Sequence, residues 1–310
     1  MMLSSKDVLG LHDMPAQEIS YILETTGTMK QLLNQNAKKM PHLQGKSIVA
    51  LFYENSTRTR LSFELAAKFL GASFSNLGVS TSSVNKGETL LDTGKTIEAM
   101  STDLIIIRHP LSGAPKFLAD NFSGSVINAG DGMHEHPTQA LLDMYTMKEH
   151  FGRIEGLNVT IVGDIYHSRV ARSNVWGLTK LGAKVTLCAP GTLIPEEMER
   201  TGAIITGDLK KGMRDADVVM GLRIQKERLE GAFLSTLREY HRYFGVNEET
   251  LQYCERDVLI MHPGPVNRGV ELSSEVMDGE KSVINEQVTN GVAVRMALLY
   301  LLTRGKKDEA

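Results

Sequence analysis

Residues 47–71 constrain the fold more than any other stretch of the sequence. The first seven, Ser-Ile-Val-Ala-Leu-Phe-Tyr, form an apolar run that is typical of a strand buried on both faces. From Arg60 onward the apolar residues recur at helical intervals, until Gly71 supplies a helix stop. A buried strand that leads directly into an amphipathic helix is the basic unit of an α/β fold with a parallel sheet.

Five polar residues, Ser-Thr-Arg-Thr-Arg at 56–60, lie between this strand and this helix. A helix N-terminus carries partial positive charge and unpaired N–H groups, and arginines add forked donors that suit phosphate or carboxylate oxygens. The alternative is a capped helix with two solvated arginines. We favour an anion site, because open α/β sheets bind ligands at the carboxyl ends of their strands.

Strands and helices alternate along the whole chain in two successive sets, which predicts two doubly wound α/β domains with parallel sheets, linked by interdomain helices. We expect residues 1–137 to form the first domain, with the C-terminal helix 289–310 packing back onto it, and residues 138–288 to form the second. The predicted strands are 47–53, 73–77, 103–110, 125–131, 158–163, 183–188, 202–206, 216–221 and 257–261.

The composition narrows the functional class. The 310 residues are enough for two domains with separate cores, and 42% hydrophobic and 23% charged residues are typical of a soluble globular protein. A formal net charge of −3 argues against a nucleic-acid partner and a membrane surface. Cys188 and Cys254 form no metal or redox motif, and neither a signal peptide nor a membrane-spanning stretch is visible. We therefore expect a cytoplasmic protein.

Basic and hydroxyl side chains recur at the carboxyl ends of the predicted strands. Those ends share one edge in a doubly wound sheet, so distant parts of the sequence can meet in one cleft. Taken singly, Arg169 and Arg223 are more often salt-bridged than ligand-binding, so the coincidence at strand ends carries the argument. The residues concerned are 56–60, Arg108, His136, Gln139, Arg169, Arg223 and 263–268.

Other kinds of site lack a pattern in the sequence. There is no nucleophile elbow, and His134 and His136 form a short pair without a third metal ligand nearby. Gly163 follows a predicted strand but lacks the further glycines of a dinucleotide site. We expect neither a cofactor nor a metal, but a cationic cleft that orients anionic substrates and stabilises an oxyanion.

Two contiguous segments, 52–64 and 136–143, resemble the shared motifs of the transcarbamoylases, the aspartate/ornithine carbamoyltransferase superfamily. The resemblance extends through 86–89, 108–110, 223–228 and 262–268 and covers nearly the whole chain. Ornithine-using members typically carry His-Cys-Leu-Pro where this chain has His-Pro-Gly-Pro at 262–265, and a Ser-Met-Gly motif that is absent here. The later motifs resemble those of the aspartate-using members.

The resemblance implies a role for each matching residue. Carbamoyl phosphate would be bound by Ser56, Thr57, Arg58, Thr59, Ser82, Lys86, Arg108, His136 and Gln139, with the backbone carbonyls of Gly264 and Pro265. L-aspartate would be bound by Lys86, Arg169, Arg223 and Gln225. The catalytic residues would be Arg58, Thr59, Lys86, Arg108 and His136, whereas Glu54 and Arg60 would be structural.

The same resemblance implies the reaction and the assembly. The carbamoyl group would pass to the amino group of L-aspartate, giving N-carbamoyl-L-aspartate and phosphate in de novo pyrimidine biosynthesis. The chain would form a homotrimer in which the loop 80–87 reaches the neighbouring active site, and a separate regulatory chain is possible. The alternatives are an ornithine carbamoyltransferase and a non-catalytic anion-binding protein on the same fold.

Overall fold

The computed structural model describes residues 3–35, 40–78, 87–196, 198–224, 236–255 and 257–304. Contacts within the chain divide it into two compact units: unit 1 is Met1–Leu142 with Val288–Ala310, and unit 2 is Asp143–Gln287. The sequence places the divisions after residues 137 and 288. The contacts place them inside two helices, α5 (Pro137–Phe151) and α11 (Ile284–Arg304).

A four-stranded parallel sheet forms the centre of unit 1. Its strands are β1 (Ser47–Phe52), β2 (Ser73–Gly78), β3 (Leu104–His109) and β4 (Ser125–Asp131), in the order β2-β1-β3-β4. The pairing of β1 with β3 places Phe52 opposite Arg108. Beyond β4, Val8 bridges to Ile127 in parallel, which extends this edge of the sheet.

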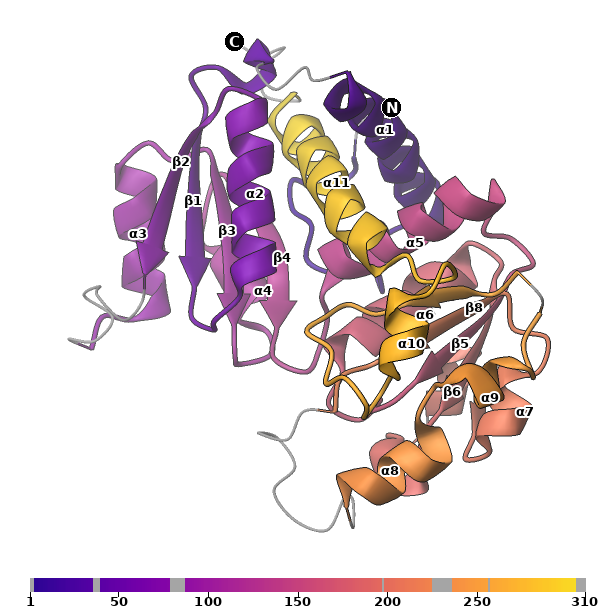
Figure 1. Cartoon of the computed structure of the whole chain (residues 1–310). Coiled ribbons are helices and arrows are strands. Elements are labelled where there is room, and N and C mark those ends of the chain that lie inside the picture. The colour runs from indigo at the N-terminus through magenta and orange to yellow at the C-terminus, as the bar shows by residue number, and fades with distance from the viewer. Residues whose placement is uncertain are drawn as a thin grey trace. The chain divides into compact units, whose positions relative to one another are not determined.

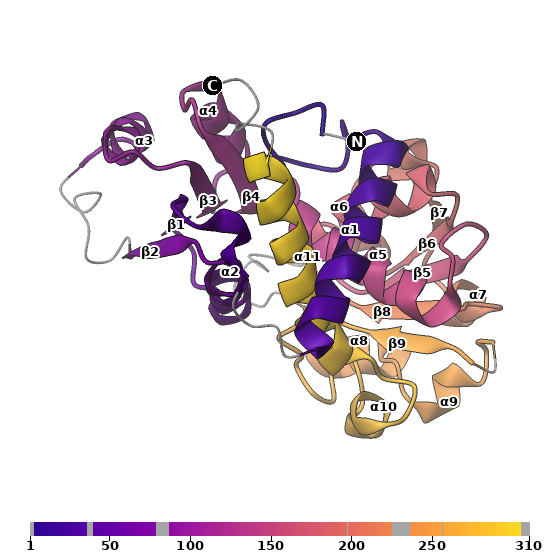
Figure 2. The ribbon, with the colours of Figure 1, turned by 90° about the horizontal axis from the view of Figure 1, so that it is seen from above.

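Helices cover both faces of the unit 1 sheet. In Figures 1 and 2, α3 (Leu90–Ala99) and α4 (Ala114–Asp120) lie on one face, and α2 (Thr57–Phe69) and α11 lie on the other. Under α3 and α4 the buried residues are Leu51, Ile97, Ile105, Ile107, Leu118, Ala119, Phe122 and Val126. Every second residue of the strands contributes to this core, as expected for side chains that alternate between faces.

On the opposite face, α11 packs against α2 through a buried cation–π contact. The guanidinium carbon of Arg295, a residue only 3% exposed, lies 5.0 Å from the ring centroid of Phe63. One turn earlier, Asn290 accepts a hydrogen bond from Lys30 of α1 (Ala16–Asn34). These contacts attach the C-terminal helix to α2, which follows β1, and to α1, which precedes it.

A five-stranded parallel sheet forms the centre of unit 2. Its strands are β5 (Asn158–Val162), β6 (Lys184–Cys188), β7 (Ile204–Thr206), β8 (Val218–Gly221) and β9 (Leu259–Met261), in the order β7-β6-β5-β8-β9. All nine predicted strands are present, with bounds within two residues of the predicted ones. The predicted fold class, two α/β units with parallel sheets, is confirmed.

Helices also lie on both faces of the unit 2 sheet. The hydroxyl of Thr160 donates to the carbonyl of Gly212 at 2.6 Å in α7 (Leu209–Met213). Met220, which lies opposite Ile161 in the ladder, instead contacts Asn174 of α6 (Arg169–Lys180). Because successive side chains of a strand point to opposite faces, α6 and α7 cover different faces. The remaining helices of this unit are α8 (Leu237–Phe244), α9 (Glu248–Leu251) and α10 (Ser274–Asp278).

The two sheets share one strand order, with β6, β5, β8 and β9 in the places of β2, β1, β3 and β4. In each sheet the chain crosses first to one side and then to the other, so the pairs β1/β3 and β5/β8 are topological switch points. Their amino ends are fixed alike: Asp103 accepts from the N–H of Ser47 at 2.9 Å, and Asp217 accepts from that of Asn158 at 2.7 Å. Ligands of such sheets bind at the opposite, carboxyl end of the switch point.

The structure corrects four local expectations. Helix α2 begins at Thr57, so residues 57–60 form its first turn and are not a linker; Ser56 is extended (φ −155°, ψ 101°) and ends the non-helical part. Helix α11 begins at Ile284, five residues before the predicted start at 289. Helix α4 was not predicted. The sequence also predicts a short polar start before the first helix, whereas Val8 and Leu11 in this segment are fully buried.

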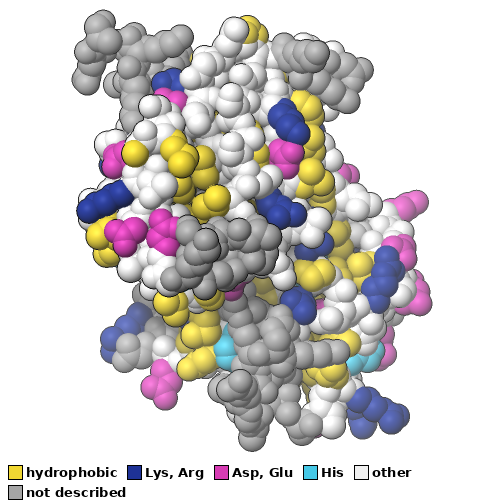
Figure 3. Space-filling model, turned by 90° about the vertical axis from the view of Figure 1, so that its left-hand side faces the viewer, with side chains coloured by type: hydrophobic (Ala, Val, Ile, Leu, Met, Phe, Trp, Pro, Cys, Tyr) yellow, Lys and Arg dark blue, Asp and Glu magenta, His cyan; other side chains and the backbone are white. Residues whose placement is uncertain are grey.

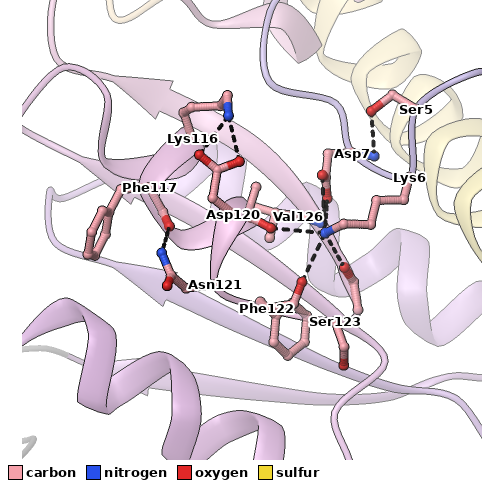
Figure 4. Close-up of polar contacts among 12 residues, drawn as sticks. Ser5, Lys6, Asp7, Lys116, Phe117, Asp120, Asn121, Phe122, Ser123 and Val126 are labelled. Atoms are coloured by element: carbon pink, nitrogen blue, oxygen red, sulfur yellow. Dashed lines mark hydrogen bonds and ion pairs between the residues drawn. The ribbon is translucent and has the colours of Figure 1, made fainter.

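Lys6 closes the C-terminal end of α4 (Figure 4). Its ammonium donates to the carbonyls of Ala119 at 3.0 Å and of Phe122 and Gly124 at 2.9 Å, and it pairs with Asp7. Carbonyls at a helix C-terminus lack partners within the helix and carry partial negative charge, so a cation stabilises them. The ammonium of Lys6 in the N-terminal segment thus stabilises the end of a helix more than a hundred residues later in the chain.

Replacing Lys6 with methionine should lower the free energy of unfolding by about 1–2 kcal/mol, because three charge-assisted hydrogen bonds are lost while the side-chain length is kept. The matched control is Lys116→Met, which removes a solvent-exposed pair with Asp120 on the same helix and should cost under about 0.5 kcal/mol. Urea unfolding of both variants at one protein concentration measures the difference. Equal effects would contradict a capping role for Lys6.

Candidate functional site

The carboxyl end of β1 leads into α2 at the switch point of unit 1. Ser56 precedes the helix, and its side chain makes no capping hydrogen bond. Thr57 and Arg58 are exposed, whereas Thr59 is buried and its carbonyl accepts from the hydroxyl of Ser62 at 2.9 Å. The helix N-terminus and the guanidinium of Arg58 therefore bring positive charge to the same end of the sheet.

Arg108 lies on the neighbouring strand, and hydrogen bonds to Glu54 and Ala129 help to hold its side chain. Its Nε donates to Oε2 of Glu54 at 3.1 Å, and its Nη1 donates to the carbonyl of Ala129 at 3.3 Å. The two charged side chains are 16% and 18% exposed, so the ion pair is partly shielded from water. Glu54, predicted to be structural, fixes the direction of Arg108 beside the start of α2.

The loop between β4 and α5 is fixed by buried carboxylates. Asp131 accepts from the N–H of Gly113 at 2.7 Å and pairs with the ring of His134 at 2.9 Å. Glu135, 1% exposed, accepts from the N–H groups of Leu11 and His12 at 2.8 and 3.1 Å. This loop positions two buried candidate residues, His136 directly before α5 and Gln139 in its first turn.

His109 is next to Arg108 but adds no positive charge of its own. Its ring lies 4.5 Å from the ring of Tyr53, and its Nδ1 accepts a hydrogen bond from the N–H of Leu111 at 3.0 Å. Burial lowers the pKa of His109, and a ring nitrogen that accepts a hydrogen bond is unprotonated. The cation at this strand end is therefore the guanidinium of Arg108.

In unit 2 the corresponding turn, between β5 and α6, carries Arg169. This arginine is the first residue of α6 and is 7% exposed. The hydroxyl of Ser168 caps the helix by accepting from Ala171 at 3.1 Å. The buried carboxylate of Asp164 accepts from the backbone N–H of His167 at 3.1 Å and contacts its ring at 3.0 Å. These bonds fix the turn that positions Arg169.

Gly163 in this turn serves close packing. It has φ +140°, and a Cβ there would lie 2.7 Å from the carbonyl oxygen of Leu222. The segment that follows β8 thus runs directly against the turn that follows β5. The dinucleotide interpretation, which the sequence disfavours, is not needed to explain this glycine.

A relay of four hydrogen bonds, three of them buried, connects α6 to the loop after β9. Asn174 donates to Asp143 at 2.9 Å, and Gln287 donates to the other oxygen of Asp143 at 2.8 Å. The carbonyl oxygen of the Gln287 side chain accepts from the N–H of His262 at 2.9 Å. His262 Nδ1 then accepts from the N–H of Gly264 at 2.8 Å. The relay leads to the cis Gly264–Pro265 peptide, a predicted ligand position.

The structure places the candidate residues in two groups, one at the carboxyl ends of the strands of each sheet. In unit 1, residues 56–59 and Arg108 lie at the switch point β1/β3, and His136 and Gln139 follow the adjacent β4. In unit 2, Arg169 and Arg223 lie at the switch point β5/β8, and Gly264 and Pro265 follow the adjacent β9. Ser82, Lys86 and Gln225 lie outside the described residues.

Sequence reasoning missed the buried polar residues that support these positions: Asp143, Asn174, Glu271 and Gln287. The available signal was a polar residue inside an apolar helical pattern. Asp143, for example, stands in Ala-Leu-Leu-Asp-Met and is fully buried. Such a residue needs a partner, but the sequence alone does not say which one.

The described residues offer little for other chemistries. Burial raises the pKa of both Cys188 and Cys254 to about 12, so neither thiol is poised as a nucleophile at neutral pH. Within the described part, no group of three or more His, Cys, Asp or Glu side chains is arranged around a metal position. No described helix combines the length and hydrophobicity needed to cross a membrane. On the face in Figure 3, basic and acidic side chains are interspersed.

Comparison with known families shows which kind of protein carries these two arginine-bearing sites. Residues 6–149 match the family model "Aspartate/ornithine carbamoyltransferase, carbamoyl-P binding domain", and residues 155–302 match "Aspartate/ornithine carbamoyltransferase, Asp/Orn binding domain". The chain belongs to the aspartate/ornithine carbamoyltransferase family. The first matched domain contains the site at β1/β3, and the second contains the site at β5/β8.

Curated members of this family include relatives with high identity. The aspartate carbamoyltransferase catalytic subunit of Ruminiclostridium cellulolyticum is 64% identical over 304 residues, which cover 98% of this chain and 97% of the relative. The subunit of the same name from Acetivibrio thermocellus is 63% identical over 310 residues, covering 100% and 99%.

Solved structures of the family share the fold but do not separate the two amino-acid substrates. Aspartate transcarbamoylase from Trypanosoma cruzi, in complex with N-(phosphonacetyl)-L-aspartic acid, superposes with a TM-score of 0.87 at 31% identity, covering 96% of each chain. Ornithine carbamoyltransferase from Pyrococcus furiosus superposes with a TM-score of 0.89 at 31% identity, covering 99% and 100%. The choice of amino acid therefore depends on sequence.

Proposed function

We propose that this chain transfers the carbamoyl group of carbamoyl phosphate to the amino group of L-aspartate, giving N-carbamoyl-L-aspartate and phosphate. The observation that carries the proposal is the pair of arginine-bearing switch points, one in each unit, in a chain about two-thirds identical to aspartate carbamoyltransferase catalytic subunits. The reaction belongs to de novo pyrimidine biosynthesis, and we expect it to take place in the cytoplasm.

The unit 1 edge would bind carbamoyl phosphate. The phosphate would lie against the N-terminus of α2, held by Ser56, Thr57, Arg58 and Thr59, with Ser82 and Lys86 as further ligands. This is the arrangement in which aligned N–H groups and a guanidinium suit a phosphate. The carbonyl oxygen would be bound by Thr59, Arg108 and His136. The carbamoyl NH₂ would donate to Gln139 and to the carbonyls of Gly264 and Pro265.

The unit 2 edge would bind the amino acid. Arg169 and Arg223 would each hold a carboxylate of L-aspartate, with Gln225 and Lys86 as additional ligands. Guanidinium forks match carboxylates in bidentate geometry, which orients the substrate as well as attracting it. Ornithine carries an ammonium in place of the second carboxylate, so a second arginine would repel its side chain.

The chemistry would then depend on position and charge. The deprotonated amine of aspartate attacks the carbamoyl carbon and forms a C–N bond, and the carbonyl electron pair moves to the oxygen. The tetrahedral oxyanion is stabilised by Thr59, Arg108 and His136. The electron pair of the oxyanion then re-forms the C=O bond as the C–O bond to phosphate breaks, and the phosphate leaves with the electron pair of the broken bond toward Arg58 and Lys86. It also takes the amine proton, since no side chain of the set is an evident base.

The deciding experiment measures phosphate release from carbamoyl phosphate with L-aspartate or L-ornithine as acceptor. We expect release with aspartate and at least about 100-fold less kcat/KM with ornithine, because a charge mismatch in a desolvated site costs several kcal/mol. Exclusive use of ornithine would replace the proposal with the ornithine enzyme. Binding of carbamoyl phosphate without release on addition of either amino acid would indicate a non-catalytic binding protein.

We also propose that the chain works as a homotrimer with shared active sites. The support is the family resemblance, in which the loop 80–87 supplies Lys86 to the neighbouring subunit. A separate regulatory chain is compatible with relatives named catalytic subunits.

A further inference from the structure

A buried carboxylate lies between the two segments of unit 2 that the proposed function assigns to substrates. Glu271 is 1% exposed and follows the loop that begins after β9. Its Oε1 accepts from the N–H of Ile224 at 2.7 Å and from Nδ2 of Asn267 at 2.6 Å. Its Oε2 accepts from the N–H of Asn267 at 2.8 Å. Both carboxylate oxygens are therefore used.

These bonds fix the backbone on the far side of Arg223. The parallel ladder of β8 with β5 ends at Gly221. One residue later, the N–H of Leu222 still donates to the carbonyl of Val162 at 2.7 Å. After that the chain leaves the sheet, and the N–H of Ile224 donates to Glu271. The backbone N–H groups on both sides of Arg223, those of Leu222 and Ile224, are therefore held by hydrogen bonds, although Arg223 lies outside any strand.

Asn267 also holds the backbone beside Arg223, and it connects this backbone to the loop after β9. Its Nδ2 also lies 3.3 Å from the carbonyl oxygen of Ile224, so Ile224 is held through both its N–H and its C=O. Asn267 is two residues beyond Pro265 in the loop after β9. Three N–H groups converging on one carboxyl favour its ionised form, because a protonated oxygen would face a donor. Burial, in contrast, raises the pKa of Glu271.

We infer that Glu271 is a positioning residue for the amino-acid substrate: by holding Ile224 against Asn267, it sets the place of Arg223 at the β5/β8 switch point. The inference rests on the proposed function, which gives Arg223 a substrate carboxylate. Glu271 itself touches no substrate in this scheme. Its loss should therefore weaken binding of the amino acid while leaving the carbamoyl-phosphate edge of unit 1 unchanged.

The test variant is Glu271→Gln, which keeps the shape of the side chain. An amide offers one oxygen and one NH₂ group, so at least one of the three donors would face another N–H. We expect KM for aspartate to rise tenfold or more, kcat at saturating aspartate to stay within threefold, and the Kd of carbamoyl phosphate to stay within twofold. A rise in KM with kcat retained is the signature of lost uniform binding.

The matched control is Asp217→Asn at the opposite edge of the same sheet. Asp217 also accepts from a backbone N–H, that of Asn158 at 2.7 Å, but it precedes β8 and lies at the amino end. This variant should lower stability without moving KM for aspartate by more than twofold. If it raises KM as much as Glu271→Gln does, the effect is general loosening of unit 2 and the inference is wrong.

Asn267→Ala covers the case in which Glu271→Gln does not fold. It leaves the bond from the N–H of Ile224 to Glu271 in place and removes the two bonds of Asn267 Nδ2, to Glu271 and to the carbonyl of Ile224, so KM for aspartate should rise about threefold. An unchanged KM in either variant contradicts the inference. Hydrogen exchange gives a readout independent of activity: exchange of residues 222–224 relative to that of residues 218–221 should rise in Glu271→Gln and not in Asp217→Asn. A wild-type chain without aspartate-dependent phosphate release contradicts the proposed function, whereas unchanged exchange contradicts the positioning role alone.

Discussion

Replacing Arg58 with alanine is expected to lower kcat/KM for carbamoyl transfer by about 3 kcal/mol or more, which corresponds to roughly 150-fold. Arg58 lies exposed in the first turn of α2, at the end of the helix where N–H groups and partial positive charge are already present. Charge builds up on the leaving phosphate as the C–O bond breaks, so the guanidinium would bind the transition state more tightly than the ground state.

The matched control is Arg60→Ala, two residues further along the same helix. Arg60 is also exposed, and the family resemblance implies a structural role for it. The two variants remove the same charge from the same element, so general electrostatic attraction should weaken equally in both. We expect Arg60→Ala to retain kcat/KM within about fivefold, in line with a screened surface charge. Near-normal kcat/KM in Arg58→Ala would remove this residue from the site.

Mixing a Lys86→Ala chain with an Arg58→Ala chain should restore roughly a quarter of wild-type activity, although each variant is inactive alone. In a cyclic trimer with shared sites, every mixed ring has one junction that joins an intact Arg58 to an intact Lys86 from the next chain. At equal amounts about three-quarters of random trimers are mixed, and each has one functional site in three. The measurement is phosphate release after subunit exchange, with exchange verified by a mass or affinity label.

A second mixture gives an internal check on the same prediction. Exchanging the wild-type chain with an Arg58→Ala/Lys86→Ala chain should reduce activity from half of the wild-type level to about a quarter, because neighbouring intact chains are then required. If activity instead stays at half, and the first mixture stays inactive, Lys86 acts within its own chain. The shared-site proposal would then be wrong.

The sequence by itself determined the class of fold and the type of site. Most of the nine strands contain a short apolar run that is buried on both faces, and such a run is a local property that the sequence shows directly. The strands β2 and β7, at the edge of each sheet, are shorter or more exposed, and their place in the alternation of strands and helices predicts them. The anion-binding character of residues 56–60 is equally local, since it depends on hydroxyl and guanidinium groups that are contiguous in the chain. The motifs that indicated the family are contiguous for the same reason.

Only the tertiary structure decided which polar groups meet. Glu54 holds Arg108 across 54 residues, Asp143 accepts from Gln287 across 144, and Glu271 holds Ile224 across 47. A buried carboxylate requires donors, but many N–H groups along the chain can satisfy it, and strand order selects among them. The strand order in turn depends on long-range pairing, which leaves no periodic signal in the sequence. The positions of Arg108 and Arg223 are therefore properties of the folded sheets, set by residues that local patterns could not identify.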